Sequence, residues 1–221
     1  MRRGFIGVFG GAFAPFHNGH LRLAIEARER LGLSQLRLVP TAHPPHRPDS
    51  RVSPRRRFEW VRLATRRERG LLVDDCEIRR DGPSFTVDTL AELHAAHPRT
   101  PLCLLMGADA FAHLHTWNRW RQILGLAHLA VIGRPGAEQP SPEVAEVLAG
   151  REAPDATTLR ESLSGCWIKL DLPALDISST RIRSRLKGGQ SVRGLVSDSI
   201  LHSFTPADIA ALTQDEDSIT H

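Results

Sequence analysis

Hydrophobic positions along the chain form short continuous runs that alternate with segments of helical spacing. The continuous runs predict buried strands over 5–9, 36–39, 102–106, 129–132 and 167–170, with another extended segment over 71–78. Apolar positions three and four apart predict helices over 21–31, 58–67, 87–96, 180–186 and 200–212, the last interrupted at Pro206. This alternation predicts an α/β fold: a Rossmann-like, doubly wound parallel sheet with helices on both faces and a small C-terminal helical segment.

The length of 221 residues permits one large α/β domain or two small domains. Because there is no internal repeat and no long linker, we expect a single domain over 1–221, with a helical segment and frayed tail over 189–221. The segment 137–154 is rich in Pro, Ala and Glu, and we expect it to be a variable surface excursion.

Composition narrows the class of protein without naming a function. The net charge of +4 suits anionic partners. The arginines at 55–57 and 66–67 flank a helix with Glu59 and Glu68 nearby, so we expect a solvated face there. Three scattered cysteines argue against a disulfide framework, and no run reaches the roughly 18–20 apolar residues of a membrane span. We therefore expect a cytoplasmic protein with neither a nucleic-acid nor a membrane partner.

The loop after the first strand carries the first candidate chemistry. Gly10 and Gly11 would allow a ligand close to the backbone, and His17 and His20 lie where the next helix begins. Imidazoles three residues apart can face one pocket and donate hydrogen bonds to phosphate oxygens. The pattern favours a phosphate site; the alternative is a zinc pair, with His43 and His46 as possible further ligands.

A second motif, Ile177-Ser178-Ser179-Thr180-Arg181-Ile182-Arg183, predicts a capped helix start. Basic residues in a first turn oppose the helix dipole, unless a bound anion compensates for them. Taken alone, the motif fits a plain capped helix with a solvated basic face equally well.

Together the two motifs resemble the H-x-G-H and I-S-S-T-x-I-R signatures of the nucleotidyltransferase superfamily. The first loop is similar to the nicotinate-nucleotide branch, which usually has G-G-T-F-D-P-x-H-x-G-H, although Ala12 and Ala14 stand in place of Thr and Asp. The resemblance extends from about Phe5 to Leu186. It implies that two histidines stabilise charge at the α-phosphorus of ATP.

The resemblance implies catalytic roles for His17, His20 and Arg183. Two inner segments extend it: Met106–Asp109 is similar to the family's G-x-D, and Ala127–Gly136 is similar to A-H-L-x-V-x-x-R-P-G. Outside the resemblance, Arg134 fits a surface arginine before a turn. The ATP-binding residues that the resemblance implies are Gly10, Gly11, Ala12, Phe13, His17, His20, Gly107, Asp109, Arg134, Ser179, Thr180 and Arg183.

The segment Pro83–Leu90 resembles the branch's P-S-Y-T-x-x-T-L, with Phe85 in place of Tyr. Free amides at a helix start can hold the carboxylate of nicotinate, and the neutral amide of nicotinamide gains less from the dipole. The implied residues for nicotinate mononucleotide are His46, Phe85, Thr86 and Trp117. An ordinary capped helix, a rigid Pro turn at 44–47 and core packing of Trp117 are the alternatives.

The resemblance implies transfer of the adenylyl group of ATP to nicotinate mononucleotide, with release of pyrophosphate. Mg²⁺ would arrive with ATP, and we expect no metal site made of protein ligands alone. Three alternatives stay open: a different acceptor such as nicotinamide mononucleotide or phosphopantetheine, a non-catalytic nucleotide-binding module, and an RNA-binding protein that uses its arginine clusters. The sequence makes no prediction about the oligomeric state.

Overall fold

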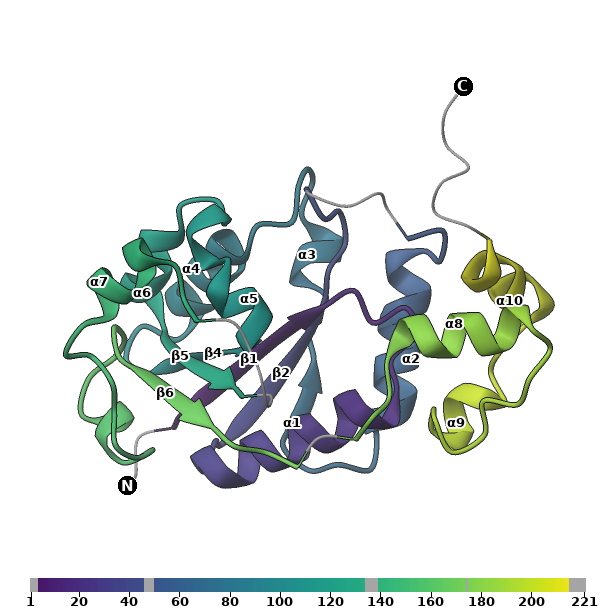
Figure 1. Cartoon of the computed structure of the whole chain (residues 1–221), viewed down its shortest axis with the longest axis horizontal. Helices are drawn as coiled ribbons and strands as arrows, with labels where there is room; N and C mark the ends of the chain where they lie inside the picture. The colour runs from purple at the N-terminus through teal and green to yellow at the C-terminus, as the bar shows by residue number, and fades with distance from the viewer. Residues whose placement is uncertain (1–3, 46–49, 134–138, 174, 215–221) are drawn as a thin grey trace.

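The computed structural model describes residues 4–45, 50–133, 139–173 and 175–214. Within this part of the chain, six strands form one sheet in the order β3-β2-β1-β4-β5-β6, and each neighbouring pair is parallel (Figure 1). The chain runs outward from β1 to β3 and then returns to the other side of β1. This reversal between β1 and β4 makes a topological switch point, where ligands bind in such sheets. The strands are β1 (Ile6–Gly11), β2 (Gln35–Pro40), β3 (Leu71–Val73), β4 (Leu102–Gly107), β5 (His128–Ile132) and β6 (Trp167–Leu170).

Helices cover both faces of the sheet, as the sequence predicted. Buried residues of α1, α2, α8, α9 and α10 form one hydrophobic core, and those of α3 to α7 form the other. The helices are α1 (Asn18–Leu31), α2 (Pro54–Thr65), α3 (Cys76–Arg79), α4 (Thr86–Ala96), α5 (Ala108–Ala112), α6 (Trp120–Leu126), α7 (Pro142–Leu148), α8 (Ser179–Lys187), α9 (Asp198–Leu201) and α10 (Pro206–Thr213), with short 3₁₀ turns at Leu114–Thr116 and Thr158–Arg160.

The central strand β4 shows why both faces are apolar. Leu102, Leu104 and Met106 belong to one core, whereas Cys103 and Leu105 belong to the other. Successive side chains of a strand point to opposite faces, so a continuous apolar run is what a doubly covered strand requires. Cys103 is fully buried, as its place in the run predicted.

The small C-terminal helical segment is also present. It contains α9 and α10, which lie together with α8 beside α2, at the right of Figure 1. The ring of Trp60 in α2 meets that of Phe204 edge-on, with centroids 5.2 Å apart. Pro206 begins α10 rather than breaking it, because proline lacks only an N–H that a first helical turn leaves unpaired.

Two local predictions were wrong. The extended segment over 71–78 ends at Val73, because the Asp74 carboxylate accepts a hydrogen bond from the Cys76 amide and α3 begins there. The segment 137–154 contains α7, whose Val144 and Leu148 are buried in the core. Their spacing of four residues is helical, and the proline that suggested a loop occupies the first turn of that helix.

The prediction of a solvated arginine face is only partly correct. Arg55, Arg66 and Arg67 are exposed, but Arg57 is only 1% exposed and Arg56 is half-buried against Asp208. Helix α2 begins at Pro54, earlier than predicted, so Arg55, Arg56 and Arg57 belong to its first turn.

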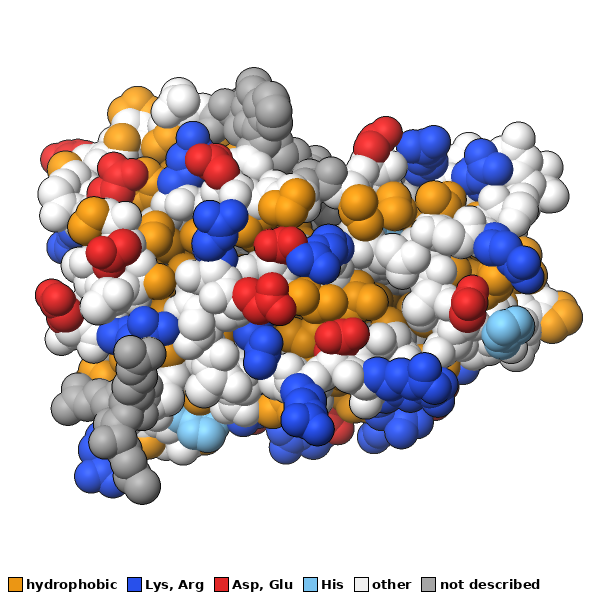
Figure 2. Space-filling model, turned by 90° about the horizontal axis from the view of Figure 1, so that it is seen from below, with side chains coloured by type: hydrophobic (Ala, Val, Ile, Leu, Met, Phe, Trp, Pro, Cys, Tyr) orange, Lys and Arg blue, Asp and Glu red, His pale blue; other side chains and the backbone are white. Residues whose placement is uncertain are grey.

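Charges of both signs share the face of the molecule drawn in Figure 2. Lys and Arg side chains are spread over this face, with Asp and Glu side chains between them. Such mixing weakens the field that a single basic stripe would present to a nucleic acid. Among helices of the described residues, none combines the length and apolar character that a membrane crossing requires.

Candidate active site

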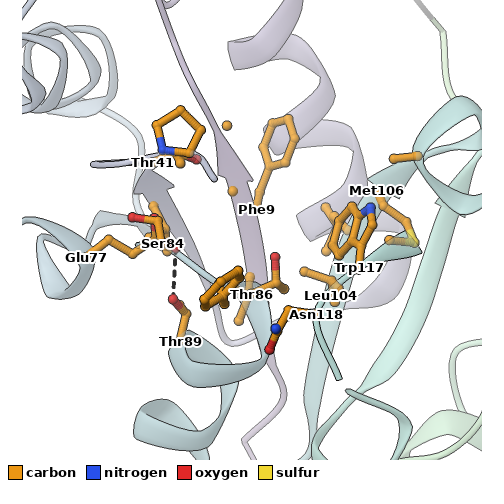
Figure 3. A pocket seen from close by; sticks show the side chains of 18 of the residues that line it. Phe9, Thr41, Glu77, Ser84, Thr86, Thr89, Leu104, Met106, Trp117 and Asn118 are labelled. Atoms are coloured by element: carbon orange, nitrogen blue, oxygen red, sulfur yellow. Dashed lines mark hydrogen bonds between the residues drawn. The ribbon is translucent and has the colours of Figure 1, made fainter. Parts of the chain in front are cut away.

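A pocket of about 310 Å³ lies at the carboxyl ends of the strands that flank the switch point (Figure 3). Gly10 and Gly11 end β1, and Met106 and Gly107 end β4. The motifs that the sequence placed just after strands therefore meet at one edge of the sheet. The other lining residues are Val8, Phe9, Val39, Thr41, Pro44, Pro45, Glu77, Ser84, Phe85, Thr86, Thr89, Leu104, Leu105, Ala110, Trp117 and Asn118.

Two pocket glycines face open space. A methyl group added at Gly10 would find its nearest neighbour, the Val39 carbonyl oxygen, at 3.9 Å, and one added at Gly107 would meet nothing within 4 Å. The protein's own packing therefore does not require glycine at either position. A methyl group there would instead take up room in the pocket.

The turn that follows β1 offers backbone hydrogen-bond donors. Among the residues that the structure describes, none accepts a hydrogen bond from the amides of Ala12 and Phe13. Phe13 has a φ of 50°, in the left-handed region that non-glycine residues rarely occupy. Successive amides in such a turn can form a concave anion site. This geometry supports the predicted phosphate loop.

His17 and His20 cap the first helix in a reciprocal arrangement. The Nδ1 atom of His17 accepts from the backbone amide of His20 at 3.2 Å, and Nδ1 of His20 accepts from the backbone amide of His17 at 3.3 Å. Their rings are stacked with centroids 3.6 Å apart. Because each neutral ring uses Nδ1 as an acceptor, its proton is on Nε2. Each ring therefore has one N–H donor to offer a phosphate oxygen.

Burial determines the charge of this pair. It lowers the pKa of His17 to about 4, and it lowers the pKa of His20 well below the usual value, with repulsion from His17 as a smaller cause. Both rings are therefore neutral near pH 7. They lie beside the pocket rather than among its lining residues, and the ring of Phe9, which lines the pocket, meets that of His20 at 6.3 Å.

The late motif lies against the first loop. The Ser179 hydroxyl donates to the Pro15 carbonyl at 3.0 Å, and Arg183 Nη1 donates to the Ala14 carbonyl at 3.0 Å. Ser178 is the N-cap of α8, where its hydroxyl accepts from the Arg181 amide. The fold thus joins two signatures that are far apart in the sequence. Thr180 lies in the same first turn of α8.

Arginine side chains anchor the first loop through its backbone at Ala12 and Ala14. The Ala12 carbonyl accepts a hydrogen bond from Arg57, and the Ala14 carbonyl accepts one from Arg183. Any residue supplies a carbonyl, so these anchors of the loop do not depend on the Thr and Asp side chains of the usual motif.

The start of α4 forms the other side of the pocket. Phe85 is its N-cap residue and makes no side-chain cap hydrogen bond. Within the described chain, the amides of Thr86 and Val87 have no hydrogen-bond acceptor. Helix starts leave such amides unpaired, and they attract anions. Thr86 lies next to the pocket in Figure 3, opposite Trp117.

The acidic residue in this first turn is neutralised locally. Asp88 accepts a hydrogen bond from Arg119 Nη2, so its charge opposes an incoming carboxylate less. The tryptophans at 117 and 120 differ clearly in their surroundings. Trp117 is half-buried and lines the pocket, whereas Trp120 is only 5% exposed and belongs to the core.

Of the predicted site residues that the structure describes, six line the pocket: Gly10, Gly11, Phe85, Thr86, Gly107 and Trp117. Eight do not: Ala12, Phe13, His17, His20, Asp109, Ser179, Thr180 and Arg183. Asp109 is exposed on α5 and absent from the lining residues. His46 and Arg134 lie outside the described residues. In the described part of the chain, no three His, Cys, Asp or Glu side chains gather as a possible metal site.

The structure adds polar lining that the sequence reasoning missed. Glu77 is buried, and its Oε1 accepts from the Thr89 hydroxyl at 2.8 Å, the contact dashed in Figure 3. Ser84 exchanges hydrogen bonds with the His43 backbone. Ser84 and Thr89 are part of the Pro83–Leu90 motif, which could have indicated them. Glu77 carried no such signal, because its segment was predicted to be extended.

Comparisons with known proteins agree with this geometry. The cytidylyltransferase-like family model matches residues 8–185. A probable nicotinate-nucleotide adenylyltransferase of Aeromonas salmonicida is 45% identical over 90% of this chain and 94% of its own length. Another, of Halorhodospira halophila, is 46% identical over 88% of this chain and 90% of its own length.

Among solved structures, the nicotinic acid mononucleotide adenylyltransferase of Plasmodium falciparum complexed with NaAD has the same fold. The TM-score is 0.66 at 14% identity, covering 95% of this chain and 94% of that one. The fold, the meeting of both signatures at the switch point and the close relatives agree. This chain belongs to the cytidylyltransferase-like family and, within it, to the nicotinate-nucleotide adenylyltransferases.

Proposed function

We infer that this protein is an enzyme that transfers the adenylyl group of ATP to nicotinate mononucleotide, giving nicotinate adenine dinucleotide and pyrophosphate. One observation carries the inference. The uncapped start of α4 and the ring of Trp117 share a single pocket with the glycines of the phosphate loop. An anion site for a pyridine carboxylate therefore lies across the same cavity from a site for ATP.

The reaction is an in-line displacement at the α-phosphorus of ATP. A phosphate oxygen of nicotinate mononucleotide forms the new P–O bond, and the bond to the β-phosphate oxygen breaks, so that pyrophosphate leaves with its electron pair. The nucleophile is already an anion, and no general base is needed. Catalysis then consists of positioning and charge stabilisation.

The groups that stabilise this charge come from both signatures. The Nε2–H donors of His17 and His20, the amides of Ala12 and Phe13 and the positive charge of Arg183 would act on the triphosphate. Gly10 and Gly107 leave it room, and Gly11 leaves room for the ring of Phe13. Ser179 and Thr180 belong to the same proposed site, and Asp109 and Arg134 complete it by family resemblance. The nucleotide substrate is MgATP, whose Mg²⁺ neutralises part of the phosphate charge.

The acceptor is proposed to lie with its carboxylate on the amides of Thr86 and Val87, beside Phe85. The pyridine ring of the mononucleotide is cationic, and stacking on Trp117 would contribute about 0.5–2 kcal/mol. His46, in the segment after Pro45, is proposed to close over it. Because the α4 dipole favours an anion, the acid form is the preferred acceptor over the amide.

The proposal also covers the domain organisation and the compartment. The family model covers residues 8–185, which supports a single catalytic unit over 1–221. The three cysteines are free, which suits a reducing compartment such as the cytoplasm.

The test measures Mg²⁺-dependent pyrophosphate release from ATP, with nicotinate mononucleotide and nicotinamide mononucleotide as separate acceptors. We expect release at least tenfold faster with the acid, and its loss in His20→Ala. Equal rates with both acceptors would keep the reaction but remove the role assigned to α4. ATP binding without release would instead identify a non-catalytic nucleotide-binding module.

A further inference from the structure

Arg57 is the most deeply buried arginine of the described chain, and its guanidinium binds three backbone carbonyls. Nη1 donates to Ala12 O at 2.7 Å, Nη2 lies 3.4 Å from Ala42 O, and Nε donates to Val52 O at 3.1 Å. These carbonyls belong to three separate segments. A planar guanidinium can span them because its five N–H donors point in fixed, divergent directions.

Two of those segments belong to opposite sides of the active site. Ala12 lies in the phosphate loop. Ala42 lies in the segment after β2, where Thr41, Pro44 and Pro45 line the pocket. That segment continues to the acceptor side, because the His43 backbone exchanges hydrogen bonds with Ser84, directly before α4. Arg57 therefore contacts the backbone of two segments that border the pocket, and it is not itself among the lining residues.

The contact to Ala12 has a direct consequence for the phosphate loop. In a trans peptide the C=O and the following N–H point in opposite directions, so a fixed Ala12 oxygen also fixes the direction of the Phe13 amide. Phe13 adopts the unfavourable positive φ of 50°. Its ring packs against that of His20, with centroids 5.1 Å apart. A change at Arg57 would thus reach both a phosphate-binding amide and a catalytic imidazole.

We propose that Arg57 is a positioning residue for adenylyl transfer. It fixes the position of the phosphate loop, which contains Ala12, relative to the segment after β2, which contains Ala42, without touching either substrate. This inference rests on the proposed function. Lysine keeps the positive charge but concentrates its donors at one atom, so it does not reproduce the separate Nε, Nη1 and Nη2 donors that reach Val52, Ala12 and Ala42. Arg57→Lys should therefore let these two segments shift relative to each other even where the fold survives.

Arg56 provides a matched control on the same helix. Its guanidinium binds the Asp208 carboxylate at 2.8 Å and the Ser203 carbonyl, so it ties α2 to the C-terminal helices and not to the pocket. Arg56→Lys and Arg57→Lys both replace a half-buried or buried guanidinium that joins α2 to other segments. They differ in whether the partner segment borders the substrates.

The experiment compares kcat, both KM values, ATP affinity and Tm of the two variants, with kinetics measured well below the lower Tm. For Arg57→Lys we expect kcat to fall at least tenfold and the KM values for ATP and nicotinate mononucleotide to rise together. Arg56→Lys should lower Tm while leaving kcat and both KM values within about twofold of the wild type. The imidazole NMR signals of His20 should move in Arg57→Lys and stay in Arg56→Lys.

Unchanged kinetics and unchanged His20 signals in a folded Arg57→Lys protein would overturn the positioning role, and Arg57 would then be structural only. Should that variant fail to fold, Arg57→Ala is assayed with low-millimolar guanidinium, which we expect to restore activity in Arg57→Ala but not in His20→Ala; absence of restoration counts against the proposal. If the wild type itself releases no pyrophosphate, the proposed function fails. The His20 signals and ATP affinity then still decide whether Arg57 positions the phosphate loop.

Discussion

His17 and His20 hold each other at the start of α1: each ring accepts a hydrogen bond from the other residue's backbone amide, and the two rings stack at 3.6 Å. The pair is therefore one structural unit with both Nδ1 atoms used. The space beside the pair is also limited, because a methyl group on Gly19 would lie only 3.0 Å from His17 Nδ1. The capping that orients the imidazoles is the same interaction that begins the helix.

The buried histidine pair should make the protein less stable in mild acid. The native pKa of His17 is about 4 and that of His20 is also lowered, whereas unfolded histidine titrates near 6.5. Between these values the unfolded state binds more protons than the native state. Their contribution is therefore fully present above pH 6.5 and is lost as the pH falls toward 4, by roughly 1.4 kcal/mol per pH unit for each histidine.

Urea unfolding between pH 7 and pH 4.5 measures how the free energy of unfolding changes with pH. The double variant His17→Asn, His20→Asn is the reference. Asparagine can still cap the helix but does not titrate. The free energy of unfolding should depend on pH less steeply in the variant than in the wild type. Equal slopes would mean that the imidazoles titrate normally in the folded protein.

Gly10→Ala and Gly107→Ala should impair substrate binding while leaving the fold intact. Neither methyl group would meet a protein atom closer than 3.9 Å, so the free energy of unfolding should change by no more than about 1 kcal/mol. Both would intrude on the pocket, and we expect the KM for a substrate to rise roughly tenfold or kcat to fall comparably. Gly125→Ala, also without a neighbour within 4 Å but outside the pocket, is the control for steady-state kinetics. Wild-type kinetics in all three variants would place the substrates elsewhere.

Thr86→Pro tests the backbone amide as the basis of acid selection. Thr86 is the first residue of α4, a position where proline is well tolerated, and the φ of −101° and ψ of 132° at Phe85 suit a residue before proline. The substitution removes one N–H donor and keeps the helix. We expect the preference for nicotinate over nicotinamide mononucleotide, measured as a ratio of kcat/KM, to fall roughly tenfold. Thr86→Ala keeps the amide and should retain the preference; a matching loss there would point to the side chain instead.

Trp117→Ala should weaken the acceptor alone. Loss of the stacked ring removes apolar contact and the cation–π attraction, so the KM for nicotinate mononucleotide should rise roughly tenfold to a hundredfold while the KM for ATP stays within about twofold. Trp117→Phe should recover part of the loss. Trp120→Ala empties a core position and should lower stability by about 3–5 kcal/mol without this selective effect. Equal increases in both KM values would contradict a stacking role for Trp117.

Local pattern was sufficient for the parts of the site that are continuous in sequence. The apolar run of β4 predicted a strand covered on both faces, and Gly10, Gly11 and Gly107 were expected at strand ends because parallel sheets bind ligands there. The start of α4 at Thr86 was visible in the same way. These features depend on periodicities of two and 3.6 residues and on helix termini, which a sequence displays directly.

The residues whose surroundings were predicted wrongly are those that distant segments of the chain contact. Arg57 looked like one of several surface arginines, and only the approach of Ala12, Ala42 and Val52 gives its guanidinium partners that permit burial. Glu77 lines the pocket because α3 begins shortly after Val73. The spacing of apolar residues in this segment did not predict that helix.

The sequence by itself thus determined the order of strands and helices, the glycine and histidine chemistry of the first loop and the family resemblance. Only the tertiary structure decided that Ser179 and Arg183 bond to Pro15 and Ala14, and that Trp117 faces the pocket while Trp120 enters the core. The physical reason is that helix capping and hydrophobic periodicity act between near neighbours in sequence. Burial and the pairing of charges instead depend on which distant segments the folded sheet brings together.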